Sequence, residues 1–334
     1  MKEPKKLLVY LPPLETDYGS MYEYTKLLIE VGLDLGYDSI KVVCNLDEDL
    51  LPKGVRVVQP TLKSSGIARA LLLLLDFIRF NCYSNAYDFV FVSQEYVLPL
   101  IRKNSLVVFH DLTQIDHPRN VFSKIIVFIS IFICKLNDSK IISPSSATQK
   151  KLLDHGLRSS VIENHFDMRE FHFSNILKFE KINIIWVGTT DAHKRLNFAL
   201  KAAQDLPSVN FILVVDKPFA MEPMQNVSLF TSVSDDLLSV LFLQSQIYLS
   251  TSKDEGFGRP LHEALAYGLD VIVSDIPAYA FVPAGRKFNS YSQMLERIEF
   301  FSLKLSIQKK NETIKFKGYS NKDLILSKYK NDWI

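Results

Sequence analysis

The sequence predicts an α/β protein made of two doubly wound units, each a parallel sheet covered by helices. Three observations lead to this fold class. The 334 residues suit two domains of ordinary size, and 47% of them are hydrophobic, which is enough to build two cores. Short apolar runs alternate with segments of helical length along the chain. A polar, aperiodic stretch near the middle interrupts this alternation, which then begins again.

The first unit contains apolar runs of four or five residues that are rich in Val, Ile, Phe and Leu and bounded by polar or turn residues. Their hydrophobicity is continuous rather than alternating, which predicts strands buried on both faces, as in a covered parallel sheet. We expect strands at 7–11, 40–43, 55–58, 89–92, 106–109 and 140–143, and helices at 21–32, 67–80, 123–136 and 145–155.

The second unit repeats this rhythm. We expect strands at 182–188, 209–216, 227–230, 247–250 and 271–274, and helices at 194–204, 235–243 and 260–267. The domains then cover 1–168 and 182–318, joined by a polar linker at 169–181. A C-terminal helix at 319–334 is expected to pack back on the N-terminal domain.

Composition and charge exclude several classes of function. The net charge of +2, from 39 basic and 37 acidic residues, gives no basis for a nucleic-acid partner. Cys44, Cys82 and Cys134 are widely spaced, which argues against a zinc site and favours a reducing compartment. The sequence has no run of 18 apolar residues, and the apolar run at 7–11 is too short for the core of a signal peptide, so a cytoplasmic protein is expected.

The strongest candidate site follows the strand at 247–250. Gly256 and Gly258 permit a tight turn and a close approach of backbone to a ligand. The helix that begins beyond them would offer free N–H groups and a positive dipole end to phosphate or sugar oxygens. Glu255 and Glu263 could border the same pocket, where an ionised carboxylate can accept two hydrogen bonds from a diol. The alternative is a glycine-rich turn before an ordinary helix, with glutamates that complement its dipole.

The spacing Glu255-x7-Glu263, within EGFGRPLHEALAYG, resembles the signature of retaining glycosyltransferases of family 4, the glycosyl transferases group 1, which have the GT-B fold. Weaker elements follow in the order of that family, and the resemblance covers about residues 5–285. These elements are Leu11-Pro-Pro…Gly19-Ser20, His110-Asp111, Ser143–Ser146, Val161–Asn164…Phe171 and Val187-Gly188…Lys194. The resemblance implies two Rossmann-like domains facing a central cleft, with the acceptor on the N-terminal domain and the nucleotide sugar on the C-terminal one.

The resemblance also implies roles for individual residues. Glu263 would bind the nucleotide ribose, and Glu255 would lie at the donor sugar and stabilise the reacting ring. Lys194 would neutralise the diphosphate, and His110 would lie near the donor sugar. The implied catalytic residues are Glu255, His110 and Lys194, and the implied donor contacts are Gly19, Gly188, Thr189, Lys194, Arg195, Glu255, Gly256, Phe257, Gly258, Arg259 and Glu263.

Two positions depart from the family pattern. Thr189 stands where the family usually has Arg, so half of the basic pair on the diphosphate is missing. Arg195 or Arg259 could supply this charge instead. Ser20 replaces the second glycine of the N-terminal loop. Neither change removes the implied chemistry.

The expected activity is transfer of a sugar, with retention, from a nucleotide-diphosphate sugar to an acceptor hydroxyl, in synthesis of bacterial surface polysaccharide, lipopolysaccharide or glycolipid. No Asp-x-Asp lies at a strand end, so no metal or other cofactor is expected. Alternatives are a GT-B epimerase, a phosphorylase, or a nucleotide-sugar-binding protein without catalysis. Thr189 supports the last of these, whereas the retention of Glu255, Glu263 and Lys194 argues against it.

The acceptor would be a saccharide or a lipid-linked saccharide. Residues 119–151 contain six basic residues and one acid around the apolar segment 125–136, which suits docking on an anionic membrane surface. The alternative is a buried helix with solvated ends. The tail from Lys304 has eight lysines against three acids, either as a solvated helical tail or as a functional basic patch.

Overall fold

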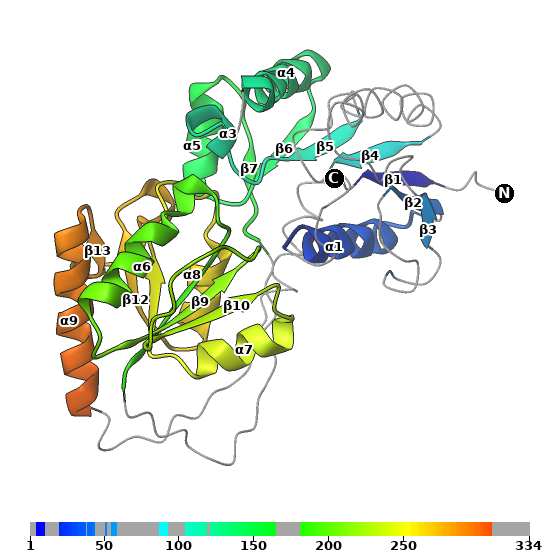
Figure 1. Ribbon diagram of the computed structural model, residues 1–334. Coiled ribbons are helices and arrows are strands. Elements are labelled where there is room, and N and C mark those ends of the chain that lie inside the picture. Colours follow the sequence, from blue (N-terminus) through cyan, green and yellow to red (C-terminus); the bar gives the residue numbers. More distant parts are fainter. Residues whose placement is uncertain are drawn as a thin grey trace. The chain divides into compact units, whose positions relative to one another are not determined.

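The computed structural model divides into two compact units, with the boundary after His165 (Figure 1). The structure describes residues 5–10, 20–37, 39–43, 51, 55–58, 87–92, 104–118, 121–164 and 181–308. The helix predicted at 67–80, the predicted terminal helix at 319–334 and all of the predicted linker except Lys181 lie outside these residues.

The first unit holds a seven-stranded parallel sheet in the order β3-β2-β1-β4-β5-β6-β7. Its strands are β1 Lys6–Tyr10, β2 Ser39–Val43, β3 Val55–Val58, β4 Phe89–Val92, β5 Ser105–Val108, β6 Lys140–Ser143 and β7 Ser160–Val161. The first six agree with the predicted strands to within one residue at each end. The two-residue β7 was not predicted, because it is too short to form an apolar run.

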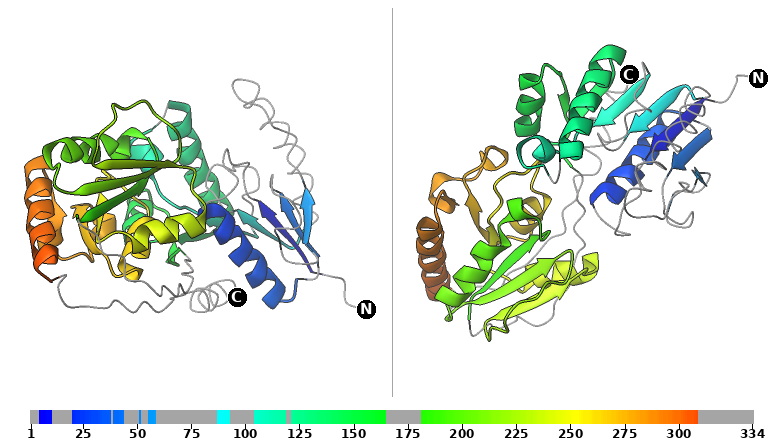
Figure 2. Two further views of the ribbon diagram at one scale, coloured as in Figure 1. Left: turned by 60° about the horizontal axis from the view of Figure 1, so that its bottom comes forward. Right: turned by 45° about the horizontal axis from the view of Figure 1, so that its top comes forward.

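The helices of this unit are α1 Ser20–Asp34, α3 Thr113–Asp116, α4 Val121–Asn137 and α5 Ser146–Asp154. Successive residues of a strand point to opposite faces of the sheet, so Leu7 packs with α1 whereas Leu8 packs with α3, α4 and α5. Helices α1 and α4 lie beside this sheet in both views of Figure 2. Ser145 begins α5 as its N-cap, since its side chain accepts a hydrogen bond from the Thr148 amide. Because Leu7 and Leu8 are buried under helices on opposite faces of the sheet, the predicted burial of both faces of the sheet is confirmed.

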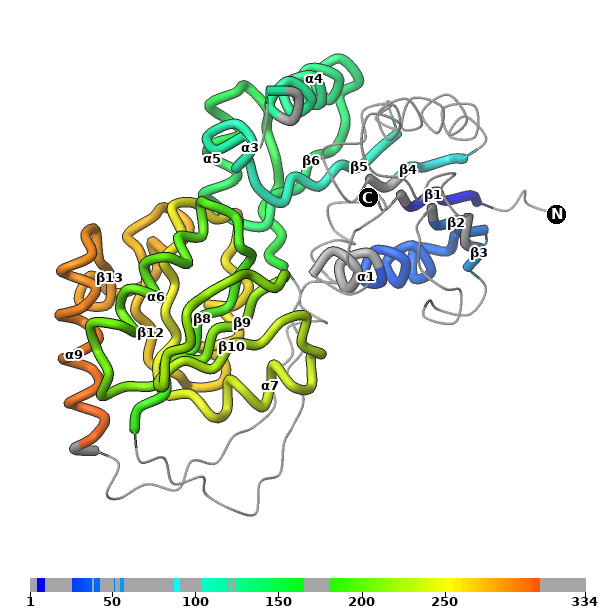
Figure 3. Tube along the Cα trace, in the orientation of Figure 1, coloured from blue at the N-terminus to red at the C-terminus, as the bar shows by residue number. Residues whose placement is uncertain are grey.

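The second unit holds a six-stranded parallel sheet in the order β10-β9-β8-β11-β12-β13. In Figure 3, the segments of β8, β9 and β10 run side by side. Its strands are β8 Asn183–Gly188, β9 Asn210–Val215, β10 Val227–Thr231, β11 Ile247–Ser250, β12 Asp270–Ser274 and β13 Lys287–Phe288. Its α-helices are α6 Leu196–Asp205, α7 Asp235–Leu243, α8 Arg259–Ala266 and α9 Tyr291–Gln308. Helices α6 and α9 cover one face of the sheet, and α7 and α8 cover the other.

Three elements of this unit differ from the prediction, and one of them, the two-residue strand β13, is too short to form an apolar run. The helix expected from Lys194 begins at Leu196, because Ala192–Lys194 form a 3-10 turn and Arg195 has a left-handed backbone with φ of 51°. Helix α9, which lies beside β13 at the sheet edge (Figure 1), was not assigned. Its buried residues Met294, Ile298 and Phe301 recur at helical spacing, which is the signal that could have found it.

The strand order places a topological switch at the middle of the second sheet. From β8 the chain builds outward through β9 and β10, and then returns to build β11 and β12 on the other side of β8. Ligands of open α/β sheets bind beyond the carboxyl ends of strands at such a switch. The loops that follow Gly188 and Ser250 lie there, and they carry the predicted site.

Candidate functional site

Lys194 and Glu255 form an ion pair at the carboxyl edge of the second sheet. The Lys194 Nζ lies 2.6 Å from the Glu255 Oε1, and only 17% and 14% of the two side chains are exposed. The Ser252 hydroxyl donates to the same carboxylate oxygen over 2.7 Å. The loop after β8 and the loop after β11 are therefore joined through two of the residues implied to be catalytic.

Arg195 holds the backbone of this edge together. Its Nε donates to the Thr251 carbonyl, and its Nη2 donates to the Ser274 hydroxyl over 2.7 Å. Its guanidinium also lies over the Phe198 ring, 4.8 Å from the centroid. Burial lowers the pKa of the Arg195 guanidinium. These contacts tie the ends of β11 and β12 to the turn that carries Lys194, so the structure gives Arg195 a place in the scaffold of the site.

Thr251 links the same turn to the core. The Trp186 indole N–H donates to the Thr251 Oγ1 over 2.9 Å, and this hydroxyl donates to the Lys194 carbonyl over 2.6 Å. A Cβ at Gly188 would lie 2.8 Å from the Trp186 ring. Gly188 is therefore needed for packing at the end of β8, where only a residue without a side chain fits.

Gly258 shapes the start of α8. It is the N-cap residue and has a left-handed backbone with φ of 77°, which favours glycine. A Cβ there would lie 2.5 Å from Tyr279 Cε1, and Tyr279 is fully buried. The Tyr279 and Ser250 hydroxyls are hydrogen-bonded over 2.9 Å. The Tyr279 ring thus packs directly against the turn at Gly258. This turn brings the N–H groups of the first turn of α8 to the edge of the sheet.

Arg259 and Glu263 pair one helical turn apart on α8, with the Arg259 Nε donating to the Glu263 Oε1 over 2.7 Å. Burial raises the pKa of the Glu263 carboxyl, and Arg259 partly opposes this shift. Arg259, which the sequence offered as a second cation for a diphosphate, is therefore engaged with the carboxylate implied to bind ribose.

His262 makes a ring contact that is not predicted from the sequence. Its ring stacks on that of Phe257, with centroids 3.9 Å apart and planes 8° apart. Its Nδ1 lies 3.2 Å from the Gly258 carbonyl oxygen. His262 therefore fixes both the aromatic residue and the glycine of the turn. Its position four residues beyond Gly258, one turn into the helix, was the available signal.

Thr189, the departure from the family pattern, lies among carboxylates. Its hydroxyl donates to Asp191 Oδ2 over 3.0 Å, and the amide of Thr190 donates to Asp216 Oδ1 over 2.8 Å. The structure thus places an acidic partner beside the position where the family usually has Arg.

Three further predicted residues, His110, Gly19 and Gly256, differ in where they lie. His110 follows β5 in the first unit and is half-buried, and Gly19 lies outside the described residues. Gly256 lies with Glu255 and Phe257 in the loop before α8.

In the described ranges, no three His, Cys, Asp or Glu side chains gather in a way that could hold a metal ion. No helix of the described part has the length and apolarity needed to cross a membrane.

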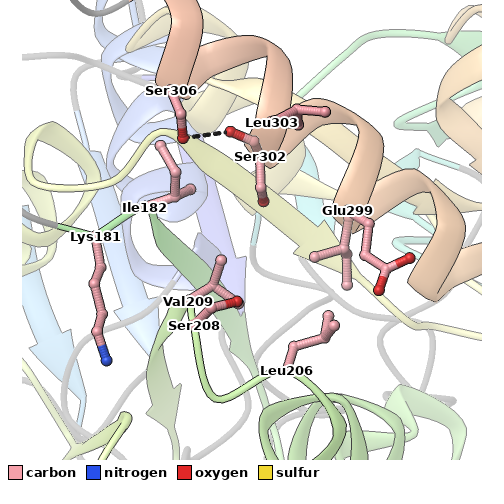
Figure 4. Close-up of a pocket in the computed structure, with 10 residues that line it drawn as sticks. Lys181, Ile182, Leu206, Ser208, Val209, Glu299, Ser302, Leu303 and Ser306 are labelled. Carbon is pink, nitrogen blue, oxygen red and sulfur yellow. Dashed lines mark hydrogen bonds between the residues drawn. The ribbon is translucent and has the colours of Figure 1, made fainter.

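A cavity of about 590 Å³ lies in the second unit away from this site (Figure 4). Ile182 and Val209, which line it, directly precede β8 and β9, so it lies at the amino ends of these strands. The Ser302 hydroxyl is buried in its wall without a hydrogen-bond partner within the described part of the chain. The cavity is at the opposite end of the sheet from Lys194 and Glu255.

Comparisons with known proteins identify the segment that carries the site. Residues 167–282 match the family model described as glycosyl transferases group 1. The chain is 29% identical over 202 residues to the O-antigen chain mannosyltransferase RfbU of Salmonella typhimurium, across 55% of each chain. The chain spans about half to two thirds of the length of the curated relatives it matches. The resemblance to this family predicted from the sequence is confirmed.

Solved structures show the fold. Sucrose-phosphate synthase of Thermosynechococcus elongatus superposes with a TM-score of 0.72 at 15% identity, over 89% of both chains. HepE of Anabaena in complex with UDP-glucose superposes with a TM-score of 0.69 at 18% identity, over 91% of both chains. The predicted GT-B fold, with two Rossmann-like units, is confirmed by these likenesses.

Proposed function

We propose that this protein is a retaining glycosyltransferase of family 4. It transfers a sugar from a nucleotide-diphosphate sugar to a hydroxyl of a saccharide or lipid-linked saccharide acceptor. The observation that carries the proposal is the ion pair of Lys194 and Glu255, 2.6 Å apart at the topological switch, within the segment that matches the group 1 model. A cation and a carboxylate at that edge are what a diphosphate and a sugar hydroxyl require.

The chemistry assigned to these residues is stabilisation of a leaving group. The bond from the anomeric carbon to the phosphate oxygen breaks, and its electron pair stays on the diphosphate. Lys194 and the first amides of α8 stabilise this charge, and they count for more in a partly buried site than in water. The acceptor oxygen bonds to the anomeric carbon on the face that the phosphate leaves, and its proton passes to the phosphate. This route requires no metal.

The descriptions of two similar proteins support a role in the synthesis of bacterial surface saccharides from nucleotide sugars. RfbU is described as a mannosyltransferase of the O-antigen chain, and HepE was solved with UDP-glucose. We therefore assign the reaction to synthesis of bacterial surface polysaccharide or lipopolysaccharide, in the cytoplasm or at the inner face of the plasma membrane.

A second candidate is a nucleotide-sugar-binding protein without catalysis. The observation that favours it is the bond from Thr189 to Asp191, which brings a carboxylate to the position of the missing Arg. Such a protein would bind the donor and release no nucleoside diphosphate with any acceptor.

The test has two stages. Thermal shift with UDP-, GDP-, ADP- and dTDP-sugars identifies the donor, because a ligand that binds the native state raises its melting temperature. Release of nucleoside diphosphate is then measured with and without saccharide acceptors, in the presence of EDTA, and NMR of the product gives its anomeric configuration. Transfer with retention supports the proposal. Binding without release supports the second candidate, conversion of the donor alone indicates an epimerase, and an inverted product contradicts retention.

A further inference from the structure

Helix α4 presents an apolar face to solvent. Large hydrophobic side chains recur along it at every third or fourth position, which places them on one side of the helix. Each is between 40% and 75% exposed, although an outward face of a surface helix is ordinarily polar. They are Val121, Ile125, Phe128, Ile129, Phe132 and Leu136.

The opposite side of α4 already has a partner. Val127, Ile131 and Cys134 are buried in the core that α4 shares with the sheet of the first unit. The helix is therefore held in place by its own fold. The exposed face is preformed and does not need a ligand to order it.

Basic side chains accompany this face. Between 121 and 151 the chain has five lysines and one acid, Asp138, and one of these lysines, Lys151, pairs with Asp116 of α3 over 2.8 Å. Lys124 and Lys135 lie on α4 itself, beyond one flank of the apolar side chains. The Lys135 Nζ donates to the His155 carbonyl at the end of α5, and the His155 ring packs edge-on against Phe128, 5.5 Å between centroids. The end of α5 thus closes one side of the face and keeps a lysine beside it.

We propose that this face of α4 docks on a lipid bilayer with anionic headgroups. The apolar side chains would enter the boundary between headgroups and acyl chains, and the lysines would lie at the phosphates. The helix would lie in the plane of the interface, and at 17 residues it is about 25 Å long. This deepens the proposed function, because it brings the enzyme to a lipid-linked acceptor, but the docking itself rests on α4 alone.

Charge favours the bilayer over a second copy of this chain. Two copies that met through α4 would bring two surfaces of the same positive sign together, whereas an anionic bilayer is complementary to them. Lysine is also depleted from the cores of protein interfaces. A dimer through α4 is therefore the competing outcome that an experiment must exclude.

The main experiment is co-sedimentation with phosphatidylglycerol–phosphatidylcholine vesicles and with phosphatidylcholine vesicles. We expect the native chain to pellet with the anionic vesicles and the variant Ile125→Ser/Phe132→Ser/Leu136→Ser to lose at least tenfold in partition coefficient. The matched control is Phe300→Ser/Leu303→Ser on α9, where the two side chains are 63% and 65% exposed. It removes exposed apolar side chains from the other unit and should pellet as the native chain does.

Two further variants test the contribution of the lysine charge and the depth to which α4 enters the bilayer. Lys124→Gln should lower the partition coefficient about fivefold at low salt and by less at high salt. In Phe132→Trp, tryptophan emission should shift to the blue on binding and be quenched by brominated acyl chains, relative to the native chain. Absence of pelleting, equal pelleting of the triple variant, or a dimer that Phe132→Ser dissociates in light scattering would overturn the proposal.

The proposed transferase activity and the proposed docking of α4 can be tested independently of each other. Nucleoside diphosphate release on a water-soluble acceptor should be the same in the α4 variant and the native chain, because α4 contributes no residue to the donor site. A chain that pellets with vesicles but transfers no sugar contradicts the proposed function and leaves the docking surface standing.

Discussion

The Lys194 Nζ lies 2.6 Å from the Glu255 Oε1, although the two residues are 61 positions apart in the chain. In the proposed reaction Lys194 binds the diphosphate and Glu255 binds the sugar, whereas in this structure the two side chains neutralise one another. A bound diphosphate would compete with Glu255 for the ammonium group. Donor binding should therefore release the Glu255 carboxylate for the sugar hydroxyls.

Replacement of Lys194 by Ala should lower the rate of transfer by more than tenfold, or about 1.4 kcal/mol of transition-state stabilisation. The reason is that Thr189 provides no second cation and Arg259 is paired with Glu263. Steady-state release of nucleoside diphosphate measures the effect. Lys304→Ala, on the exposed side of α9, is the control and should transfer at the native rate. A smaller loss in Lys194→Ala would mean that another cation holds the phosphate.

The affinity for the donor should fall as the pH is lowered through the pKa of Glu263, which burial raises above the ordinary value of 4.5. A protonated carboxyl loses acceptor capacity for the ribose diol. Calorimetric titration with a nucleotide-diphosphate sugar between pH 5 and 8 tests this. Glu263→Gln should bind more weakly and show less dependence on pH. Equal affinity in the variant would remove the ribose assignment.

The same shift predicts an effect on stability without ligand. Because its pKa is raised, the folded carboxyl binds a proton more tightly than the unfolded one. Glu263 should therefore favour folding at low pH, and this contribution should disappear as the pH rises from 4.5 through the raised pKa. The difference in free energy of unfolding between the native chain and Glu263→Gln, from urea titrations across that range, isolates it. If the free energy of unfolding of the native chain rose relative to that of Glu263→Gln as the pH increased, the predicted direction of the effect would be contradicted.

Gly258→Ala should destabilise the protein more than Gly268→Ala does. Both glycines have left-handed backbones, with φ of 77° and 75°, and each substitution should cost about 1–2 kcal/mol for that reason. A Cβ at 258 meets the buried Tyr279 ring, whereas one at 268 has nothing within 4 Å. The contact should add about 1–3 kcal/mol. Thermal unfolding compares the two, and equal losses would mean that the ring moves aside freely.

Arg195 carries a left-handed backbone without being glycine, so its two simplest replacements should differ. Arg195→Ala and Arg195→Gly both lose the contacts with Thr251 and Ser274, and each should cost about 1–3 kcal/mol. Gly relieves the backbone strain at φ of 51° and should be the more stable variant by about 1 kcal/mol. Urea unfolding measures both. An Ala variant as stable as the Gly variant would show that the turn rearranges once the guanidinium is gone.

Much of the fold could be predicted because its signal is local. Runs such as Phe89–Val92 and Ile247–Ser250 are short, apolar throughout and bounded by polar residues, which only a covered parallel sheet accommodates. The start of α8 can be predicted for the same reason, since Gly258 marks a turn and Pro260, two residues later, suits the first turn of a helix.

The contacts within the site were not predictable in this way. From the sequence, Arg195 is a candidate cation for binding a phosphate. Only the fold shows that its guanidinium donates hydrogen bonds to Thr251 and Ser274, which lie at the ends of two strands. The support of Gly258 by Tyr279 likewise depends on a residue that follows β12. Helix α6 begins two residues later than predicted, because no local signal in the sequence marks a left-handed arginine.

The central place of β8 in the second sheet has a consequence for how this unit folds. Strand β8 pairs with β9, which follows it closely, but also with β11, which is made some sixty residues later. The pairing with β11 closes a longer loop than the pairing with β9, so it has the greater entropic cost and is expected to form later. During synthesis Lys194 would leave the ribosome well before Glu255, so the nascent unit would remain without its ion pair until β11 docks. Acquisition of donor binding should thus mark the last stage of folding of this unit.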